Sequence, residues 1–227
     1  VNSYWQSNMM LLLKRSRKTF DIIEPILAQY GIPEDFKYLA VAESGLQNVI
    51  SSAGAKGVWQ FMQNSARPYG IEINSEVDER YHLEKSTVAA CMYLKEAYNI
   101  YGNWTLAAAA YNRGKAGISR DLKKQLVDNY YDLHLNTETG RYVFRILALK
   151  TIMESPQNYG FIIDEADYYS QPPVKDIYID STIENISEFA ASLGSNYHVI
   201  KTLNPWLLSN KLTVKANTYI IKAPLTE

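Results

Sequence analysis

Cysteine and histidine are scarce in this chain of 227 residues, which holds one cysteine, Cys91, and three histidines. A single cysteine excludes an internal disulfide and a cysteine-ligated zinc site. The histidines (His82, His134 and His198) are far apart and lack the spacing of paired metal ligands. The sequence therefore predicts no metal site.

An excess of positive charge is also missing, since 23 Lys and Arg residues stand against 24 Asp and Glu. A nucleic-acid partner is disfavoured, because such proteins normally carry a basic surplus. No apolar run approaches the ~18 residues that a membrane span needs, and the first residues lack the pattern of a signal peptide. A hydrophobic content of 47% disfavours a disordered chain, and the length allows one or two domains.

Tyrosine is abundant, with 18 residues against 6 Phe and 4 Trp. Its apolar face and hydroxyl suit sugars, which have C–H faces and hydroxyl edges. Any single tyrosine on a helix is nevertheless more typical of a packed core. The number of tyrosines is therefore compatible with a carbohydrate ligand, but only the sequence motifs can identify one.

Helical periodicity dominates the first 160 residues. Helices are predicted over 20–30, 33–45, 86–101, 104–111 and 137–153, and another helical stretch is expected to begin over 58–62. After Pro-rich 168–173 the pattern becomes strand, helix, helix, strand, with strands at 177–179 and 218–221. We therefore predict a mainly α protein followed by a small α+β module, with domains at 1–165 and 174–227 and a linker at 166–173.

Glu43 is the first candidate for chemistry. It lies in the last turn of the predicted 33–45 helix, four residues after Leu39 and on the same apolar side. The negative end of the helix dipole and apolar neighbours both favour a neutral carboxyl and raise its pKa. A carboxyl that is neutral near working pH is what a general acid needs.

Four motifs follow in order along the chain. They are Ala42-Glu43-Ser44, then Gly57-Val58-Trp59-Gln60-Phe61-Met62 after a small-residue loop, then Ala109 to Gly114, and then Glu138 to Val143. Together they resemble the catalytic domain of the lytic transglycosylases, glycoside hydrolase family 23, over about Pro33 to Gly160. The Trp-Gln-Phe form is most similar to the D branch of the membrane-bound murein enzymes. The resemblance implies a lysozyme-like helical fold of the goose type.

The resemblance makes Glu43 the single catalytic acid and base. It assigns substrate-binding roles, mostly along a glycan groove, to Ser51, Gln60, Met62, Tyr93, Tyr111, Asn112, Glu138 and Tyr142. Met62 and Tyr93 are equally typical of a core, and Glu138 of an acid stabilised at a helix start. The implied reaction cleaves peptidoglycan strands between N-acetylmuramic acid and N-acetylglucosamine, forms a 1,6-anhydro ring and needs no cofactor.

Residues 178–224 resemble a LysM domain, a small peptidoglycan-binding fold. The usual Gly-Asp-Thr start reads Asp180-Ser181-Thr182 here, and the glycine before the last strand is replaced around 215–217. Such a module either binds sugar or serves only as a packing partner, and the sequence leaves both open. Lys201, Asn204 and Trp206 are its candidate exposed residues, with a core position as the alternative for Trp206.

Two other functions remain open. A lysozyme-like hydrolase would need a further acid to activate water, and Glu72, Glu76, Asp78 and Glu79 are candidates. A non-catalytic wall-binding protein is the second alternative. A peptidoglycan substrate implies a location in the cell envelope or periplasm, with outer-membrane anchoring through an upstream lipoprotein signal as an option. The sequence predicts no oligomeric state.

Overall fold

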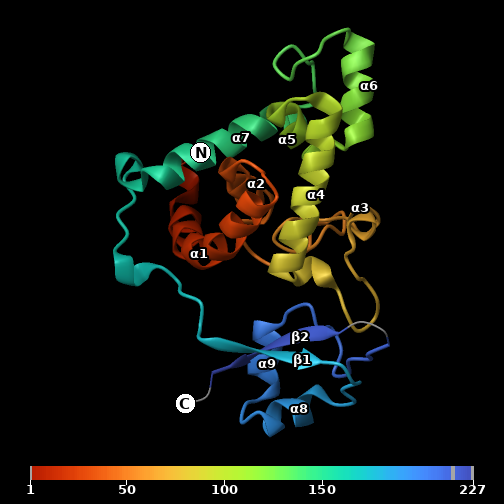
Figure 1. Ribbon diagram of the computed structural model, residues 1–227. Helices are drawn as coiled ribbons and strands as arrows, with labels where there is room; N and C mark the ends of the chain where they lie inside the picture. The colour runs from red at the N-terminus through yellow and green to blue at the C-terminus, as the bar shows by residue number, and fades with distance from the viewer. Residues whose placement is uncertain (1, 216–217, 226–227) are drawn as a thin grey trace. The chain divides into compact units, whose positions relative to one another are not determined.

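The computed structural model describes residues 2–215 and 218–225, and the side chains from residue 8 onward (Figure 1). Ala216 and Asn217, where a LysM glycine is replaced, lie outside the described residues. The helices are α1 (Asn2–Gln29), α2 (Lys37–Ser44), α3 (Gln63–Ala66), α4 (Leu83–Tyr101), α5 (Trp104–Arg113), α6 (Lys115–Gln125), α7 (Thr137–Glu154), α8 (Ile186–Ser192) and α9 (Tyr197–Leu203). The strands are β1 (Val174–Ile179) and β2 (Tyr219–Pro224). The predicted mainly α fold with a small α+β end is confirmed.

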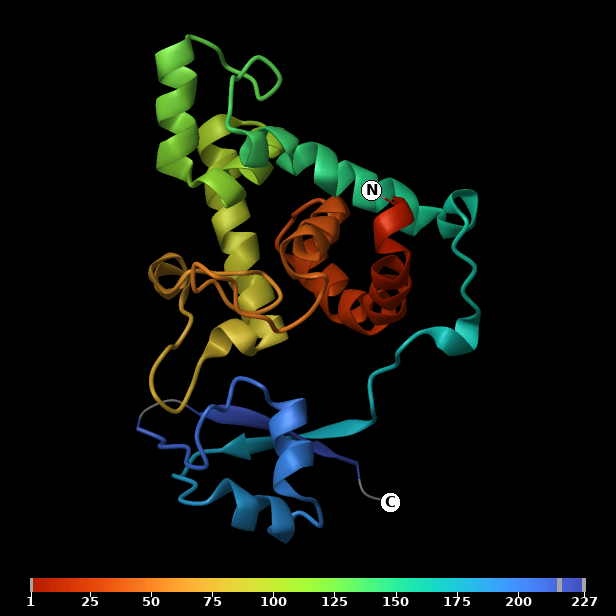
Figure 2. The same ribbon diagram turned by 180° about the vertical axis from the view of Figure 1, so that it is seen from behind.

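The chain forms two compact units, and each unit is made of two segments that are separate in the sequence. One contains residues 1–47 and 87–169, and the other contains residues 48–86 and 170–227. The helices of the first unit and the strands of the second can be followed in Figures 1 and 2. The predicted domain boundaries at 165 and 174 stay a prediction.

In the first unit, α2 packs against α1 and α7, and α5 packs against α6 and α7. Fully buried Leu27, Leu39, Leu94 and Leu106 are among the residues of its interior. Within α4, the buried residues Ala90, Leu94 and Ala97 recur at helical spacing, so this helix buries one stripe of its surface. The N-terminal helix α1 packs on the fold through Met9 and Leu13, which share a cluster with Ile152 and Phe161. In the described part of the chain, no helix combines the length and apolar character needed to cross a membrane.

The helix that carries Glu43 is defined at both ends by its sequence. Pro33 precedes one 3-10 turn at Glu34–Phe36, and α2 continues from it. Gly45 ends α2 in the left-handed conformation, at φ 61°, where glycine has no steric penalty. Both ends agree with the predicted 33–45 helix.

Helix α6 is absent from the predicted helices, since Gly114 and Gly117 are residues that usually interrupt a helix. Gly114 does separate α5 from α6, but Gly117 lies buried inside α6. A Cβ at that position would meet the Arg113 side chain at 3.0 Å. Gly117 therefore allows close packing, and the cost of a glycine inside a helix is tolerated.

The C-terminal module (residues 174–227) has the predicted order of strand, helix, helix and strand. β1 and β2 pair antiparallel, with Ile177 opposite Ile221. Asn185 and Asn196 cap α8 and α9 by accepting hydrogen bonds from the first-turn amides. The inner strand residues pack on both helices around buried Ile200.

Residues 48–62, the Gln60 loop, form turns and isolated bridges in place of the helix expected over 58–62. Lys56 pairs with Ile50 and with Phe61. Gln60 has φ 50°, a left-handed conformation that a continuous helix does not contain. Gly57 has φ 82° and lies against the backbone of Arg80, so the turn closes on the segment that follows it.

Gly57→Ala and Gly54→Ala make a matched test of this loop. Both glycines are left-handed, at φ 82° and 86°, but a Cβ on Gly57 would lie 1.9 Å from the Arg80 carbonyl oxygen, whereas Gly54 has nothing within 4 Å. We expect Gly54→Ala to cost about 1 kcal/mol and Gly57→Ala at least about 2 kcal/mol more in free energy of unfolding. Urea denaturation measures both values, and equal losses would contradict the close approach.

Candidate active site

Glu43 lies in the last turn of α2, two residues before the terminating Gly45, and is half-buried. Helix α2 packs against α7. The Tyr142 hydroxyl, on α7, donates a hydrogen bond to Glu43 Oε1. Tyr142 is 5% exposed, so this contact connects two packed helices whose residues are 99 positions apart in the sequence.

Three side chains of α7 influence the Glu43 carboxyl. Glu138, Tyr142 and Arg145 are spaced by four and three residues, which places them on one helix face. Tyr142 donates its hydroxyl proton, Arg145 contributes a positive charge and Glu138 a negative one. Tyr142 and Arg145 therefore favour ionisation of the Glu43 carboxyl, and Glu138 disfavours it.

Burial is the largest influence on Glu43 and raises its pKa to about 6. Removal from water disfavours the charged form of a carboxyl. The Tyr142 hydrogen bond and Arg145 lower this pKa, while the negative charge of Glu138 raises it. Near neutral pH a useful fraction of Glu43 is protonated, which lets the same group donate a proton and later accept one.

Tyr111 lies beside the acid, near the C-terminal end of α5. Burial is the largest influence on its pKa, followed by the charge of Glu43, and both raise it. The Tyr93 ring meets the Tyr111 ring edge-on, with centroids 5.2 Å apart. Tyr93 itself is buried, and its hydroxyl donates to the Ala110 carbonyl at 2.7 Å. In this arrangement Tyr93 supports Tyr111, and its predicted contact with substrate stays a prediction.

Asn112 and Glu138 form a second polar pair in this unit. Asn112 Nδ2 donates to Glu138 Oε1 at 3.1 Å, and Asn112 Oδ1 accepts from the buried Thr139 hydroxyl at 2.8 Å. Thr139 is fixed in turn by its backbone amide, which donates to Asn136, the residue that caps α7. Asn112 is thus oriented from both sides of its amide group.

Ser51, Gln60 and Met62 belong to the other compact unit. The Ser51 hydroxyl accepts from the Ala55 amide at 3.0 Å, and the Gln60 side-chain amide donates to the carbonyls of Val49 and Gly57. Met62 is 44% exposed. Gln60 therefore holds its own loop closed, while Met62 presents an apolar surface; their predicted roles in substrate binding stay predictions.

Arg145 and Thr139 contribute to the site but are not among the predicted site residues. An exposed arginine on a long helix is usually a surface residue, and only its spacing of three from Tyr142 points to Glu43. Thr139 lay inside the fourth motif, but its role depends on contact with Asn112, 27 residues away. Helical spacing could have identified Arg145, whereas no local signal identifies Thr139.

The candidate exposed residues of the C-terminal module are placed differently from the prediction. Trp206 is 3% and Asn204 1% exposed. Asn204 exchanges hydrogen bonds with the Lys222 backbone at 2.7 and 2.8 Å, and the Lys201 ammonium donates to the carbonyls of Leu207 and Ser209. Trp206 and Asn204 stabilise the module from inside. The predicted exposure of Asn204 is therefore wrong, and the core alternative holds for Trp206.

Two family models match the chain. Residues 22–134 match the transglycosylase SLT domain, and residues 175–227 match the soluble lytic transglycosylase C-terminal LysM-like domain. The chain is therefore built from an SLT transglycosylase domain and a LysM-like domain, and the resemblance to lytic transglycosylases is confirmed. The first match ends before Glu138 and Tyr142.

The chain is homologous to a curated protein, membrane-bound lytic murein transglycosylase D. The proteins of this name from Escherichia coli K12 and Escherichia coli O6:H1 are each 26% identical over 197 residues, 84% of this chain and 43% of theirs. The chain thus spans less than half the length of these relatives. A solved structure of an inactive mutant of lytic transglycosylase Slt from Pseudomonas aeruginosa has a TM-score of 0.49 and 21% identity, over 66% of this chain and 26% of that one.

The balance of charges around Glu43 predicts the direction of three pKa changes. Arg145→Gln and Tyr142→Phe each remove a group that lowers the Glu43 pKa, so both raise it above about 6; Glu138→Gln lowers it. NMR titration of the Glu43 carboxyl carbon measures all three. Arg141→Gln, one turn from Arg145, is the control and is expected to leave the value unchanged. A lower pKa in Arg145→Gln would contradict the assignment.

The raised pKa also predicts how stability depends on pH. Because the native state holds the Glu43 proton more tightly than the unfolded chain, the stability from this group is complete below pH 4.5 and lost as pH rises through about 6. The neutral side chain in Glu43→Gln does not undergo that loss. The free energy of unfolding of this variant, relative to that of the native protein, is therefore expected to gain about 1–2 kcal/mol between pH 4 and pH 8. Chemical denaturation at both pH values measures the gain, and a constant difference would refute the shift.

Proposed function

We propose that this protein is a lytic transglycosylase that cleaves murein glycan strands, with Glu43 as its single acid and base. The observation that carries this proposal is a half-buried carboxyl, with a raised pKa, held by Tyr142 beside Tyr111. The SLT domain and the murein transglycosylases it resembles supply the substrate class. Peptidoglycan lies outside the cytoplasmic membrane, so we place the protein in the cell envelope.

The reaction needs one proton donor. Protonated Glu43 gives its proton to the glycosidic oxygen between N-acetylmuramic acid and N-acetylglucosamine, and the C1–O bond breaks. The Glu43 carboxylate then takes the proton of the C6 hydroxyl of the same muramyl residue, whose oxygen bonds to C1. The products are a free glucosamine 4-hydroxyl and a 1,6-anhydro ring, and the carboxyl is protonated again. An intramolecular nucleophile has a high effective concentration.

The groups around Glu43 suit both halves of this cycle. Burial keeps the proton on the carboxyl before cleavage. The Tyr142 hydroxyl stabilises the carboxylate that forms after the proton has left. Ser51, Gln60, Met62, Tyr93, Tyr111, Asn112 and Glu138 are the proposed substrate-binding residues.

A hydrolase would need a second acid to activate water. The four acids considered for this role all have partners inside the second unit. Asp78 pairs with Arg80, Glu79 with Lys85, Glu76 binds Thr213 and Glu72 binds Tyr219. Each of these carboxylates is thus already engaged by a partner, which favours the transglycosylase as the proposed function.

Digestion of purified murein by the native protein and by Glu43→Gln tests the proposal. We expect muropeptides one water lighter than hydrolysis products from the native protein, and a rate at least about 100-fold lower from the variant. Glu154→Gln, at the far end of α7, is the matched control. Products of full hydrolytic mass would make the protein a hydrolase, and co-sedimentation with murein without products would make it a binding protein.

A further inference from the structure

The C-terminal module shares its core with residues 72–84, here called the clasp segment. Val77 is 1% exposed and packs in one cluster with Ile186, Ile200 and Leu212 of the module. The backbones pair beside it, because the Asp78 amide donates to the Trp206 carbonyl at 2.9 Å and the Leu208 amide donates to the Glu76 carbonyl at 2.8 Å. This contact is part of one compact unit.

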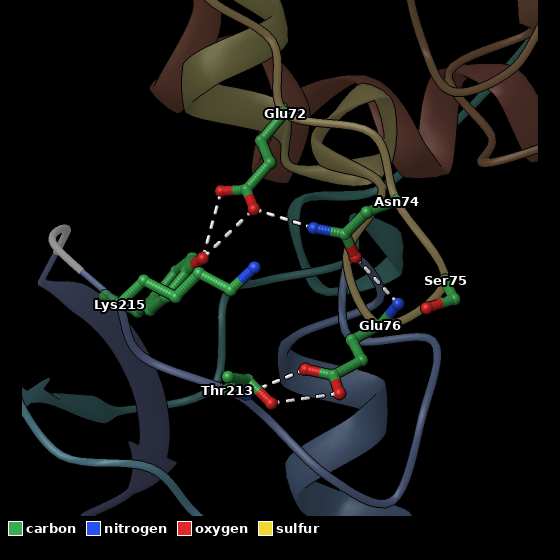
Figure 3. Close-up of a pocket in the computed structure, with 7 residues that line it drawn as sticks. Glu72, Asn74, Ser75, Glu76, Thr213 and Lys215 are labelled. Carbon is green, nitrogen blue, oxygen red and sulfur yellow. Dashed lines mark hydrogen bonds between the residues drawn. The ribbon is translucent and has the colours of Figure 1, made fainter.

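Two carboxylates of the clasp segment accept hydrogen bonds from the module (Figure 3). Glu76 accepts from the Thr213 amide at 2.7 Å and from its hydroxyl at 3.1 Å. Glu72 accepts from the Tyr219 hydroxyl at 3.0 and 3.1 Å. A pocket of about 320 Å³ lies among these groups. The clasp is therefore made of specific polar contacts as well as apolar burial.

Aromatic stacking and an ion pair complete the clasp. The Trp206 ring stacks on His82, with centroids 5.7 Å apart, and on Tyr219, at 5.8 Å. The Lys222 ammonium, from β2, donates to Glu84. Although burial opposes it, His82, whose Nδ1 lies 3.2 Å from the carboxylate, and Lys222 lower the pKa of Glu84 to about 2. The Glu84 carboxylate therefore stays ionised well below its ordinary pKa, which maintains its contact with Lys222.

Asp78 connects the clasp to the Gln60 loop. Its amide binds the Trp206 carbonyl, and its buried carboxylate binds Arg80 at 2.7 and 2.8 Å and Lys56 at 3.2 Å. Arg80 then donates to the Phe61 carbonyl at 3.2 Å. Arg80 is 3% exposed, and its own carbonyl closes over Gly57. A continuous chain of bonds therefore runs from the module to the turn that holds Gln60.

We propose that the C-terminal module positions the Gln60 loop through Trp206 and Asp78, and so sets the affinity of the protein for glycan. The proposal rests on the proposed function, because it takes Ser51, Gln60 and Met62 as glycan-binding residues. Trp206 and Asp78 are positioning residues that act through the loop. The module then acts as a structural support for the Gln60 loop, a role that we call the brace. An independent wall-binding domain would instead present its binding residues to solvent.

Hydrogen exchange tests the brace without depending on activity. In the full chain, Trp206→Ala is expected to speed amide exchange of residues 51–61 at least about fivefold, with α7 amides as the internal control. Tyr219→Phe keeps the ring on Trp206 but removes the bond to Glu72, so it is expected to give a smaller change in the same amides. Unchanged exchange at 51–61 in a folded Trp206→Ala protein would overturn the proposal.

Kinetics on a short soluble murein glycan give the second measurement. Trp206→Ala is expected to raise KM at least about fivefold with kcat within about twofold, because the loop binds substrate and Glu43 is untouched. Tyr178→Ser, on the exposed face of β1 (72% exposed), is the control and leaves KM unchanged. Loss of adsorption to insoluble murein with an unchanged KM would overturn the brace.

If the native protein does not cleave glycan, the proposed function fails, while faster exchange at 51–61 still supports the brace.

Discussion

The carboxyl of Glu43, at the end of α2, lies against α7. There it is shielded from water and accepts a hydrogen bond from the Tyr142 hydroxyl. This contact forms where Gly45 ends α2, two residues after the acid, and where the first turn of α7 is fixed. Asn136 caps α7, and the Tyr130 hydroxyl donates to the carbonyls of Thr139 and Gly140. The orientation of Asn112 and Glu138 follows from the same turn. The polar arrangement of the first unit thus depends on how α7 begins and where α2 stops.

The proposed chemistry depends on opposing influences on the Glu43 pKa that nearly balance. Burial alone would keep Glu43 protonated and make it a poor base, whereas Tyr142 and Arg145 alone would keep it ionised and make it a poor acid. The pKa of about 6 lies between these limits. A group that must give a proton and take one in the same turnover works best in that range. Under the proposed function, this balance is how one carboxyl serves where most glycosidases use two.

Local patterns predicted most helices and the strand–helix–helix–strand module, because caps, glycines and apolar spacing act over a few residues. The same patterns singled out Glu43 as a candidate. They failed at residues 58–62, where the left-handed Gln60 and the Arg80 contact override a helix-like composition. They left an exposed and a core position open for Trp206, since a tryptophan stacked between His82 and Tyr219 has no signature in its own neighbourhood. The motifs named Tyr142, but its bond to Glu43 spans 99 residues and only the packing of α2 on α7 creates it. The contribution of Arg145 is a charge at a distance, which no motif records.

The role of Glu43 as acid is best tested by the dependence of kcat/KM on pH, measured with a soluble murein glycan. We expect a rate that falls as pH rises, with an apparent pKa of about 6 for the loss of the Glu43 proton. We also expect this limb to move to higher pH in Arg145→Gln. A falling limb near 4.5, the ordinary value for a solvated glutamate, would show that Glu43 is not held neutral by its surroundings. A limb that stays in place in Arg145→Gln would show that another group limits the reaction.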